Sequence, residues 1–227
     1  MLKHSSRPAF CYAECMAHPF AHPERADDYG LLAVGGDLRP ETLLAAYRHG
    51  VFPWYDEGDP ILWWSPDPRA VFDLNGLHVS RRLGRTLRSQ RFKVTINQDF
   101  AGVIRGCAEG REEGTWITSD MIDAYERLHH LGHAHSVEVW HEEKLAGGIY
   151  GVAVAGLFAG ESMFTHVRDA SKVALVHLVE RLRERGFQLF DIQFLTDHSK
   201  SLGAVEIPRV EYLRRLRSAL TGAATFA

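Results

Sequence analysis

The sequence lacks the features that would place the protein in a membrane or in an oxidising compartment. No apolar run approaches the roughly 18 residues that a membrane-spanning helix needs. The N-terminal residues also lack the apolar core of a secretory signal peptide. Only three cysteines are present, without the spacing of a disulfide framework, which fits a reducing environment. We therefore expect a cytoplasmic protein with no membrane association.

Several common catalytic motifs and any strong excess of charge are missing as well. There is no Walker loop, no G-x-G-x-x-G fingerprint, no G-x-S-x-G elbow and no H-E-x-x-H helix. These absences argue against P-loop NTPases, dinucleotide-dependent enzymes, α/β-hydrolases and zinc metalloproteases of that type. The formal net charge of -3 argues against a polycation, although a local basic stripe can still bind nucleic acid.

What the sequence does contain is the pattern of a globular protein with helices and strands in mixed order. Its 227 residues, 45% of them hydrophobic, suffice for a substantial core. Strand-like runs at 135–140, 145–154 and 157–164 predict a meander, followed by an amphipathic helix at 171–185 and a strand at 187–193. This order predicts an α+β or α/β fold in which helices cover a mixed sheet.

Capping residues and prolines predict further helices and a domain boundary. Helices are expected between Pro40 and Gly50, from Ser80 to about Ser89, after Asp99 and at 119–131, and a strand at 92–96. The prolines between residues 56 and 72 favour a domain junction. We expect a small N-terminal domain of residues 1–62, with an irregular segment at 1–28, and a second domain of residues 63–227.

A basic stripe without any acidic residue runs from residue 77 to residue 93. Helical spacing places Arg81, Arg85 and Arg88 on one face of the predicted helix. Cations without counter-charges repel one another, and the phosphate backbone of a nucleic acid would neutralise them. A solvated helix face and a phosphate-binding surface both fit this pattern.

Two acids and one amide lie in strands that are otherwise largely apolar. Alternation puts Glu161 and Met163 on one face, although an outward Glu on an edge strand is the simpler interpretation. Asp191 and Gln193 share one face of their strand and must form hydrogen bonds there. They are either a structural pair or an acid and an amide that position a nucleophile and its proton.

Two further clusters have the residue types of binding sites. Trp54, Trp63 and Trp64 flank the expected domain junction, where they would pack between domains or stack against a base. The N-terminal segment carries a C-x3-C-x2-H-x3-H pattern: Cys11, Cys15, His18 and His22. This spacing lacks the long gap of zinc fingers, so we expect no metal site.

Taken together, these segments resemble the leucyl/phenylalanyl-tRNA–protein transferase family over roughly residues 29–213. The matching strings are GLLAVGGDL (30–38), LLAAYRHGVFPWY (43–55), PILWWSPDPRAVF (60–72), LHVSRRL (77–83), GTWIT (114–118), AYERLHHLGHAHSVEVW (124–140), GGIYGVA (147–153), GESMF (160–164), ASK (170–172) and SLGAVEIPR (201–209). So many motifs in the same order argue against a chance resemblance.

The resemblance implies an enzyme that moves Leu or Phe from a charged tRNA to the N-terminal Arg or Lys of an acceptor protein, producing an N-degron for proteolysis. It implies a small N-terminal domain and a C-terminal GNAT-like acyltransferase domain. No metal or organic cofactor is expected, because the aminoacyl ester is already activated. The expected partners are aminoacyl-tRNA and acceptor proteins, with no membrane, and the expected state is a monomer.

The resemblance also implies roles for individual residues. Asp191 and Gln193 match the catalytic pair, in which Gln193 holds or relays the proton of the attacking amine and Asp191 orients it. Glu161 matches an acid that binds near the substrate amine. The aminoacyl side-chain pocket would be shaped by Phe158, Gly160, Met163 and Phe190, and the terminal adenosine or the pocket rim would be contacted by Trp54 and Trp116. Acceptor-stem phosphates would be contacted by Arg81, Arg85 and Arg88.

Two other hypotheses fit the residues less completely. A GNAT-like acyltransferase that uses a CoA thioester would need a glycine-rich pyrophosphate loop before the helix at 171–185, and none is present. A non-catalytic RNA-binding protein would use the basic stripe but leave Glu161, Asp191 and Gln193 with structural roles only. Replacing Gln193 by Ala separates these hypotheses, because an enzyme should lose transfer and keep tRNA binding.

Overall fold

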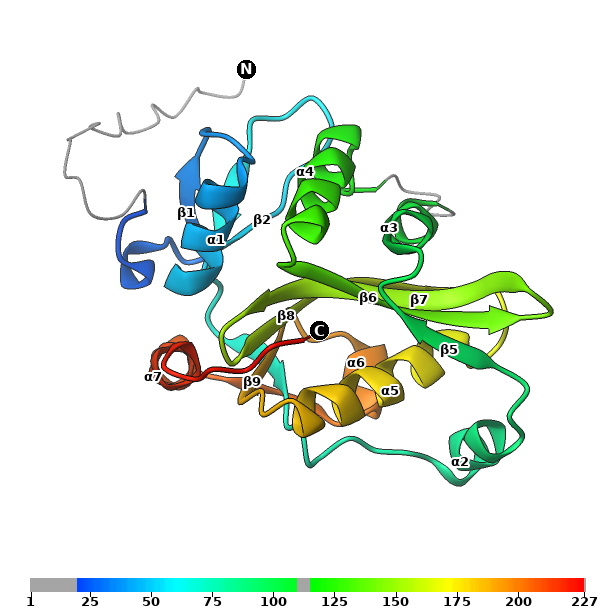
Figure 1. Ribbon diagram of the computed structural model, residues 1–227. Coiled ribbons are helices and arrows are strands. Elements are labelled where there is room, and N and C mark those ends of the chain that lie inside the picture. Colours follow the sequence, from blue (N-terminus) through cyan, green and yellow to red (C-terminus); the bar gives the residue numbers. More distant parts are fainter. Residues whose placement is uncertain (1–19, 110–114, 227) are drawn as a thin grey trace, which may run out of the picture.

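The computed structural model of the protein, shown in Figure 1, describes residues 20–109 and 115–226. Its strands form two sheets, of which the smaller has the antiparallel order β1-β3-β2. The elements of this part are η1, a 3-10 helix at Pro23–Arg25, β1 (Leu31–Val34), α1 (Pro40–His49), β2 (Phe52–Pro53) and β3 (Leu62–Trp64). The small sheet therefore gathers the described N-terminal residues into one unit.

The larger sheet has seven strands in the order β10-β4-β9-β8-β7-β6-β5. They span Arg69–Phe72 (β4), Lys93–Ile96 (β5), Ala134–His141 (β6), Lys144–Val154 (β7), Leu157–Thr165 (β8), Leu189–Gln193 (β9) and Ala204–Ile207 (β10). Neighbouring strands are antiparallel except β8 and β9, which run parallel and are joined by the crossover helix α5 (Ala170–Glu184). The expected mixed α/β fold class and the meander of β6, β7 and β8 are confirmed.

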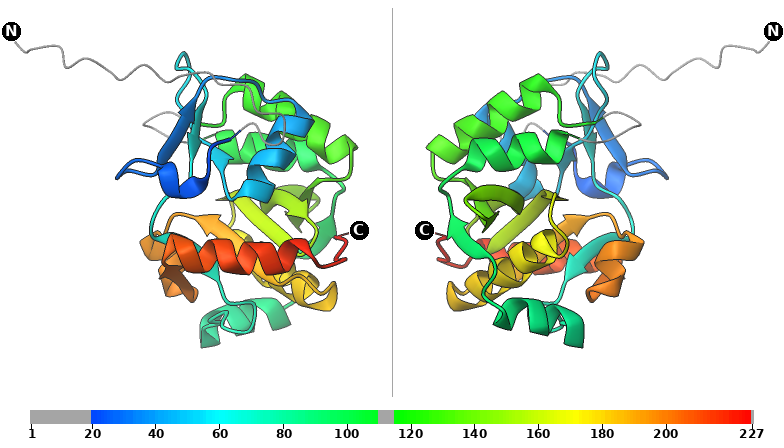
Figure 2. Two further views of the ribbon diagram at one scale, coloured as in Figure 1. Left: turned by 90° about the vertical axis from the view of Figure 1, so that its left-hand side faces the viewer. Right: turned by 90° about the vertical axis from the view of Figure 1, so that its right-hand side faces the viewer.

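Helices cover both faces of the larger sheet, as Figure 1 and Figure 2 show. α1, α3 (Phe100–Ala108) and α4 (Ser119–His130) lie on one face, and α5 packs on the other. α2 (Arg81–Arg88) lies beside α5, α6 (Asp197–Ser201) follows β9, and α7 (Arg209–Leu220) packs against β8 and β9. The buried apolar residues form two clusters, one with side chains of α1, α3 and α4 and the other with side chains of α5. Because successive residues of a strand face opposite sides of the sheet, a residue's position in its strand decides which cluster its side chain joins.

Local capping explains why the predicted helices form where they do. Pro40 begins α1, and Gly50 follows its end in the left-handed conformation, with φ of 81°. A Cβ added to Gly50 would lie 2.8 Å from Leu213 Cδ2, so both backbone and packing select glycine there. The side chains of Ser80 and Asp99 accept hydrogen bonds from the first turns of α2 and α3. The predicted helices at these positions are confirmed.

A β-bulge in β8 changes which face its residues occupy. The register of β7 and β8 shifts between Tyr150 and Gly151, which leaves Glu161 as an extra residue in β8. One extra residue reverses the alternation beyond it. Glu161 therefore bonds to side chains from α1 and α4, whereas Met163 packs into the cluster on the α5 side. The prediction that Glu161 and Met163 share a face is wrong for this reason.

The structure also holds elements that the sequence pattern does not predict. β3 and β4 lie within the proline-rich stretch, where Pro66 and Pro68 occupy the connection between the two strands. The C-terminal α6, β10 and α7 are likewise additions to the predicted order. Across the described ranges, no helix combines the length and the apolarity needed to cross a bilayer.

Candidate active site

Arg69, Asp191 and Tyr212 form a buried polar centre contributed by β4, β9 and α7. The Arg69 guanidinium donates from Nε to Asp191 Oδ1 at 2.9 Å and from Nη2 to Asp191 Oδ2 at 2.7 Å. This is a bidentate ion pair, and the Tyr212 hydroxyl also donates to Asp191 Oδ2 at 2.9 Å. Both side chains of the ion pair are only 1% exposed, so each charge depends on these protein partners.

The surroundings of Arg69 stabilise its charge. Its guanidinium carbon lies 4.6 Å from the centre of the Phe52 ring and 4.5 Å from that of the Tyr212 ring. Its Nη1 donates to the Gly50 carbonyl at 3.2 Å. Burial by itself would lower the pKa of Arg69, but the Asp191 carboxylate outweighs burial and raises that pKa. Arg69 is therefore a permanent cation that fixes the Asp191 carboxylate.

Gln193 ends β9 in a strained turn. Its φ of 60° lies in the left-handed region, and the Phe194 N–H donates across it to the Ile192 carbonyl at 2.7 Å. Holding a non-glycine residue in such a conformation costs about 1–3 kcal/mol, and strain of this kind clusters at active sites. The Gln193 N–H donates to Asp191 Oδ1 at 3.0 Å, which anchors the turn. The turn therefore sets the direction of the Gln193 side chain.

Glu161 receives the Gln193 amide and two tyrosine hydroxyls. Gln193 Nε2 donates to Glu161 Oε1 at 3.3 Å. Tyr47 of α1 donates to Oε1 at 2.8 Å, Tyr125 of α4 donates to Oε2 at 3.1 Å, and the two hydroxyls also contact each other. Withdrawal from water raises the pKa of Glu161 to about 7, although the tyrosine hydrogen bonds oppose the rise. Glu161 can therefore hold or release a proton near neutral pH.

The structure thus brings together three of the predicted site residues, Asp191, Gln193 and Glu161. They come from β8 and β9, the parallel pair of the sheet, and they are joined through side chains from α1, α4, β4 and α7. We call this group the polar cluster, and its members are Arg69, Asp191, Tyr212, Gln193, Glu161, Tyr47 and Tyr125. Its hydrogen bonds form a connected network that requires all of its strands and helices to be in place.

Exposed aromatic side chains flank the polar cluster. Trp54 is 42% exposed and Phe194 is 40% exposed, and their ring centres lie 5.4 Å apart. Because Phe194 directly follows the buried Gln193, this aromatic pair lies at the surface beside the cluster. Trp64 packs against Trp54 at 5.9 Å, and Trp116 is partly buried against the core on the α1 and α4 side.

The remaining predicted pocket residues lie mainly on the α5 side of the sheet. Phe158 and Phe190 are fully buried there with ring centres 5.8 Å apart, and Met163 packs against the same cluster. A Cβ added to Gly160 would lie 2.9 Å from Phe190 Cε2, so this glycine makes room for the Phe190 ring. These four residues support the sheet behind the polar cluster, and the structure does not place them within it.

The basic stripe lies away from the polar cluster, on the α5 side of the larger sheet. Arg81, Arg85 and Arg88 are exposed on α2 and line an open hollow of about 620 Å³ together with Ser80. None of the three arginines forms an ion pair within residues 20–109 and 115–226. The structure therefore presents them to solvent as free positive charge.

Four members of the polar cluster escape the sequence analysis: Arg69, Tyr47, Tyr125 and Tyr212. A signal exists for Arg69, because a lone Arg that opens an apolar strand needs an acid if it is buried. A weaker one exists for Tyr47, because a tyrosine on the apolar face of a predicted helix needs a partner for its hydroxyl. The same signal exists for Tyr125, which lies in the helix predicted at 119–131. Tyr212 shows none, because its helix α7 is not among the predicted elements.

The described residues contain no group of three or more His, Cys, Asp or Glu side chains arranged to hold a metal. Three members of the N-terminal Cys/His pattern, Cys11, Cys15 and His18, lie outside the described residues. The fourth, His22, precedes η1, where its Nδ1 accepts a hydrogen bond from the Glu24 N–H at 3.4 Å. His22 is thus used as a helix cap in this structure.

Comparison with known proteins identifies relatives along most of the chain. Residues 71–217 match the family described as leucyl/phenylalanyl-tRNA protein transferase, and residues 36–67 match the N-terminal domain of that description. The chain is 55% identical over 205 residues to the leucyl/phenylalanyl-tRNA–protein transferase of Shigella dysenteriae serotype 1 (strain Sd197), covering 89% of this chain and 88% of that protein. It is 54% identical, with the same coverage, to that of Escherichia coli (strain K12 / DH10B). Among solved structures, it is similar to an aminoglycoside acetyltransferase from an uncultured soil metagenomic sample, with a TM-score of 0.41, 14% identity, and coverage of 50% of this chain and 85% of that one.

Proposed function

Because the chain belongs to the leucyl/phenylalanyl-tRNA protein transferase family, we propose that it transfers Leu or Phe from an aminoacyl-tRNA to an acceptor protein. The acceptor carries an N-terminal Arg or Lys, and the added residue marks the product for proteolysis. In this proposal the protein acts as a cytoplasmic monomer without a metal or organic cofactor. In the proposal, residues 1–62 form a small N-terminal domain and residues 63–227 a GNAT-like catalytic domain. The separate small sheet supports a distinct N-terminal unit, but its strand β3 (Leu62–Trp64) extends across the proposed boundary.

The proposed reaction is the aminolysis of an ester. The acceptor α-amine attacks the carbonyl carbon of the aminoacyl ester, an amide bond forms, and the ribose oxygen of the tRNA leaves. The amine loses one proton and the departing oxygen gains one, so protons balance. An α-amine titrates near ~7.7–8.0, so part of it is neutral at pH 7. Positioning and stabilisation of the developing oxyanion can therefore supply most of the rate.

The observation that carries this proposal is the strained, doubly anchored Gln193. Its backbone N–H is held by Asp191 and its side-chain amide by Glu161. Both Asp191 oxygens are occupied by Arg69, Tyr212 and the Gln193 N–H, so Asp191 acts as a positioning residue that does not take up the proton. Gln193 is then the group that holds the attacking amine.

Glu161 is the group suited to proton transfer. In the proposal it binds near the substrate amine, and its pKa of about 7 lets it accept the proton that the amine loses. Tyr47 and Tyr125 hold its two oxygens, so the carboxylate keeps one orientation during the reaction. The proton then passes to the departing ribose oxygen by way of Gln193 or Glu161.

The aminoacyl side chain is proposed to enter beside the exposed aromatic pair. Trp54 and Trp116 would stack on the terminal adenosine or form the rim of the pocket. The depth of the pocket would be set by the four residues that support the sheet behind the polar cluster, Phe158, Gly160, Met163 and Phe190. Discrimination by shape is worth about 1–3 kcal/mol per methylene, which suits an enzyme that accepts both Leu and Phe. Phosphates of the acceptor stem would be contacted by Arg81, Arg85 and Arg88.

Transfer of labelled Leu from Leu-tRNA to a peptide that begins with Arg tests this proposal, with an Ala peptide as the control. Label is expected on the Arg peptide alone. Gln193→Ala should abolish transfer and keep tRNA binding, whereas Gln188→Ala, an exposed glutamine before β9, should leave both unchanged. If neither peptide is labelled while tRNA still binds, the transferase assignment is overturned in favour of an RNA-binding protein.

A further inference from the structure

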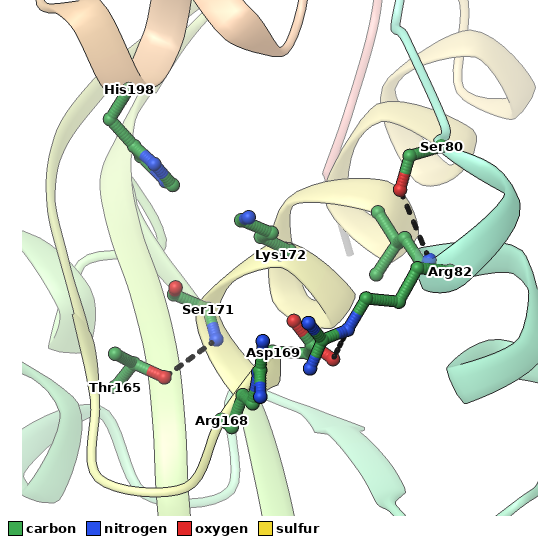
Figure 3. A pocket seen from close by; sticks show the side chains of 9 residues that line it. Ser80, Arg82, Thr165, Arg168, Asp169, Ser171, Lys172 and His198 are labelled. Carbon is green, nitrogen blue, oxygen red and sulfur yellow. Dashed lines mark hydrogen bonds and ion pairs between the residues drawn. The ribbon is translucent and has the colours of Figure 1, made fainter.

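A second hollow lies between α2, α5 and α6, outside the polar cluster. Its volume is about 290 Å³, at the lower limit of small-molecule sites, which suits one chemical group better than a whole nucleotide. Figure 3 shows side chains from the three helices converging on it. It is lined by Ser80, Arg82, Leu83, Thr165, Arg168, Asp169, Ser171, Lys172 and His198.

The charge in this hollow is positive and only partly neutralised. Arg82, Arg168 and Lys172 are cations, and Asp169 is the single carboxylate among the lining residues. Arg82 lies 3.9 Å from Asp169, whereas Arg168 and Lys172 form no ion pair in the part of the chain that the structure describes. Burial and the nearby Lys172 ammonium lower the pKa of His198, which reports the same positive potential. An anion placed here would relieve that repulsion.

Ser171 adds a hydrogen-bond donor to the same hollow. The residue is 7% exposed, and its backbone N–H donates to Thr165 Oγ1 at 3.4 Å, which leaves its hydroxyl available to a ligand. In Figure 3 the Ser171 hydroxyl, the Lys172 ammonium and the His198 ring turn toward the same space. A phosphate oxygen bound there would accept hydrogen bonds from all three groups.

The hollow also lies between the two regions that the proposed function needs to connect. Thr165 is the last residue of β8, Ser171 follows that strand, and His198 follows β9. All three residues therefore come from the carboxyl ends of a parallel strand pair. His198 is five residues after Gln193, which bounds the separation of their Cα atoms at about 18 Å. Ser80 lines this hollow and also the one that Arg81 lines. An RNA strand that passes from α2 to Gln193 would therefore cross the hollow.

We propose that this hollow binds one phosphate group of the aminoacyl-tRNA, held by Arg168, Ser171 and Lys172, between the acceptor stem on α2 and the aminoacyl end at Gln193. The inference rests on the proposed function and adds a phosphate subsite to it. Phosphate could also come from a nucleotide such as CoA, so the test includes both sources.

The test measures binding of deacylated tRNA to the full-length protein at several salt concentrations. Arg168→Gln and Lys172→Gln are each expected to weaken binding and to reduce the slope of log K against log salt by about one. Ser171→Ala should weaken tRNA binding without lowering the melting temperature, because no protein hydrogen bond is lost. The matched control, Arg183→Gln, removes an exposed cation from the last turn of the same helix and should leave the slope unchanged.

Transfer of Leu by the same variants separates this inference from the proposed function. Wild type that transfers Leu while all three hollow variants keep its tRNA affinity and salt slope would overturn the subsite and leave the function intact. Wild type that neither binds tRNA nor transfers Leu would overturn both. Millimolar CoA should neither bind nor displace tRNA, and saturable CoA binding that Lys172→Gln abolishes would assign the hollow to a nucleotide instead.

Discussion

The polar cluster and the basic face of α2 handle charge in opposite ways. In the cluster, Arg69 and Asp191 are buried and paired, and Glu161 is held by two tyrosines. On α2, Arg81, Arg85 and Arg88 are exposed, and none of them forms an ion pair with the residues that the structure describes. The cluster fixes its groups by geometry before any ligand arrives, which is what a step that depends on orientation requires. Under the proposed function, the phosphates of the bound tRNA provide the counter-charge for this helix.

This difference predicts opposite responses to mutation and to salt. Removing one partner of a buried ion pair costs several kcal/mol of folding free energy, whereas exposed substitutions stay within about 0.5 kcal/mol. Salt screens exposed charges strongly and buried pairs weakly. The polar cluster should therefore govern stability and turnover, and α2 should govern the affinity for tRNA and its salt dependence.

The largest effect is expected for Arg69→Met. The change leaves Asp191 buried without a counter-charge, which should lower the free energy of unfolding by about 3–5 kcal/mol in urea denaturation. Arg105→Met is the matched control, because Arg105 Nη2 lies 2.8 Å from Glu126 Oε1 in an exposed pair and should cost less than about 1 kcal/mol. Similar losses in the two variants would remove the contrast between buried and exposed charge.

The next effect is expected on turnover when Gln193 is shortened. Gln193→Asn keeps an amide and a residue type that tolerates positive φ, but the shorter side chain no longer reaches Glu161. Single-turnover transfer at saturating tRNA should fall about 10²–10³-fold, the size seen when one positioned hydrogen-bond donor is lost. Unfolding free energy should change little. Full activity in this variant would show that the amide need not be held by Glu161.

A smaller effect is expected on the pH dependence of stability. The folded-state pKa of Glu161, about 7, lies above its ordinary value of 4.5, so between these pH values the folded protein holds a proton that the unfolded chain has released. Wild-type stability should therefore fall as pH rises from about 4.5 to 7, by on the order of 3 kcal/mol, and then level off.

Glu161→Gln cannot ionise and should lose this slope in urea unfolding at pH 5 and pH 8. Glu184→Gln, at an exposed position on α5, is the control that should keep it. A slope of equal size in wild type and in Glu161→Gln would assign the pH dependence to another group.

The same comparison explains which parts of the molecule are readable from the sequence. The basic stripe and α2 follow from local spacing and a cap at Ser80, so both are predictable. The polar cluster depends on partners 122 residues apart in the case of Arg69 and Asp191, and 114 residues apart in the case of Tyr47 and Glu161. Alternation identifies Asp191 and Gln193 as polar groups that need partners, but it does not identify the partners.

The placement of Glu161 shows a second limit of sequence reasoning. One extra residue in β8 turns its side chain toward Tyr47 and Tyr125 and reverses the positions beyond it. The alternation of apolar and polar residues in the sequence does not reveal where such an extra residue is inserted. The same shift explains why Met163, expected beside Glu161, packs on the α5 side.

The smallest effect on the fold, with a clear effect on binding, is expected for the triple change Arg81→Gln, Arg85→Gln and Arg88→Gln. Removing mutually repelling exposed cations should change the free energy of unfolding by less than about 0.5 kcal/mol. If each arginine neutralises one phosphate, the slope of log K against log salt for tRNA should fall by about 0.9 per contact. Arg217→Gln, an exposed cation on α7, is the control that should leave the slope unchanged. A triple variant with the wild-type slope would mean that α2 is a solvated face and that the RNA is held elsewhere. The contrast between a polar cluster that governs turnover and a helix α2 that governs tRNA affinity would then be wrong.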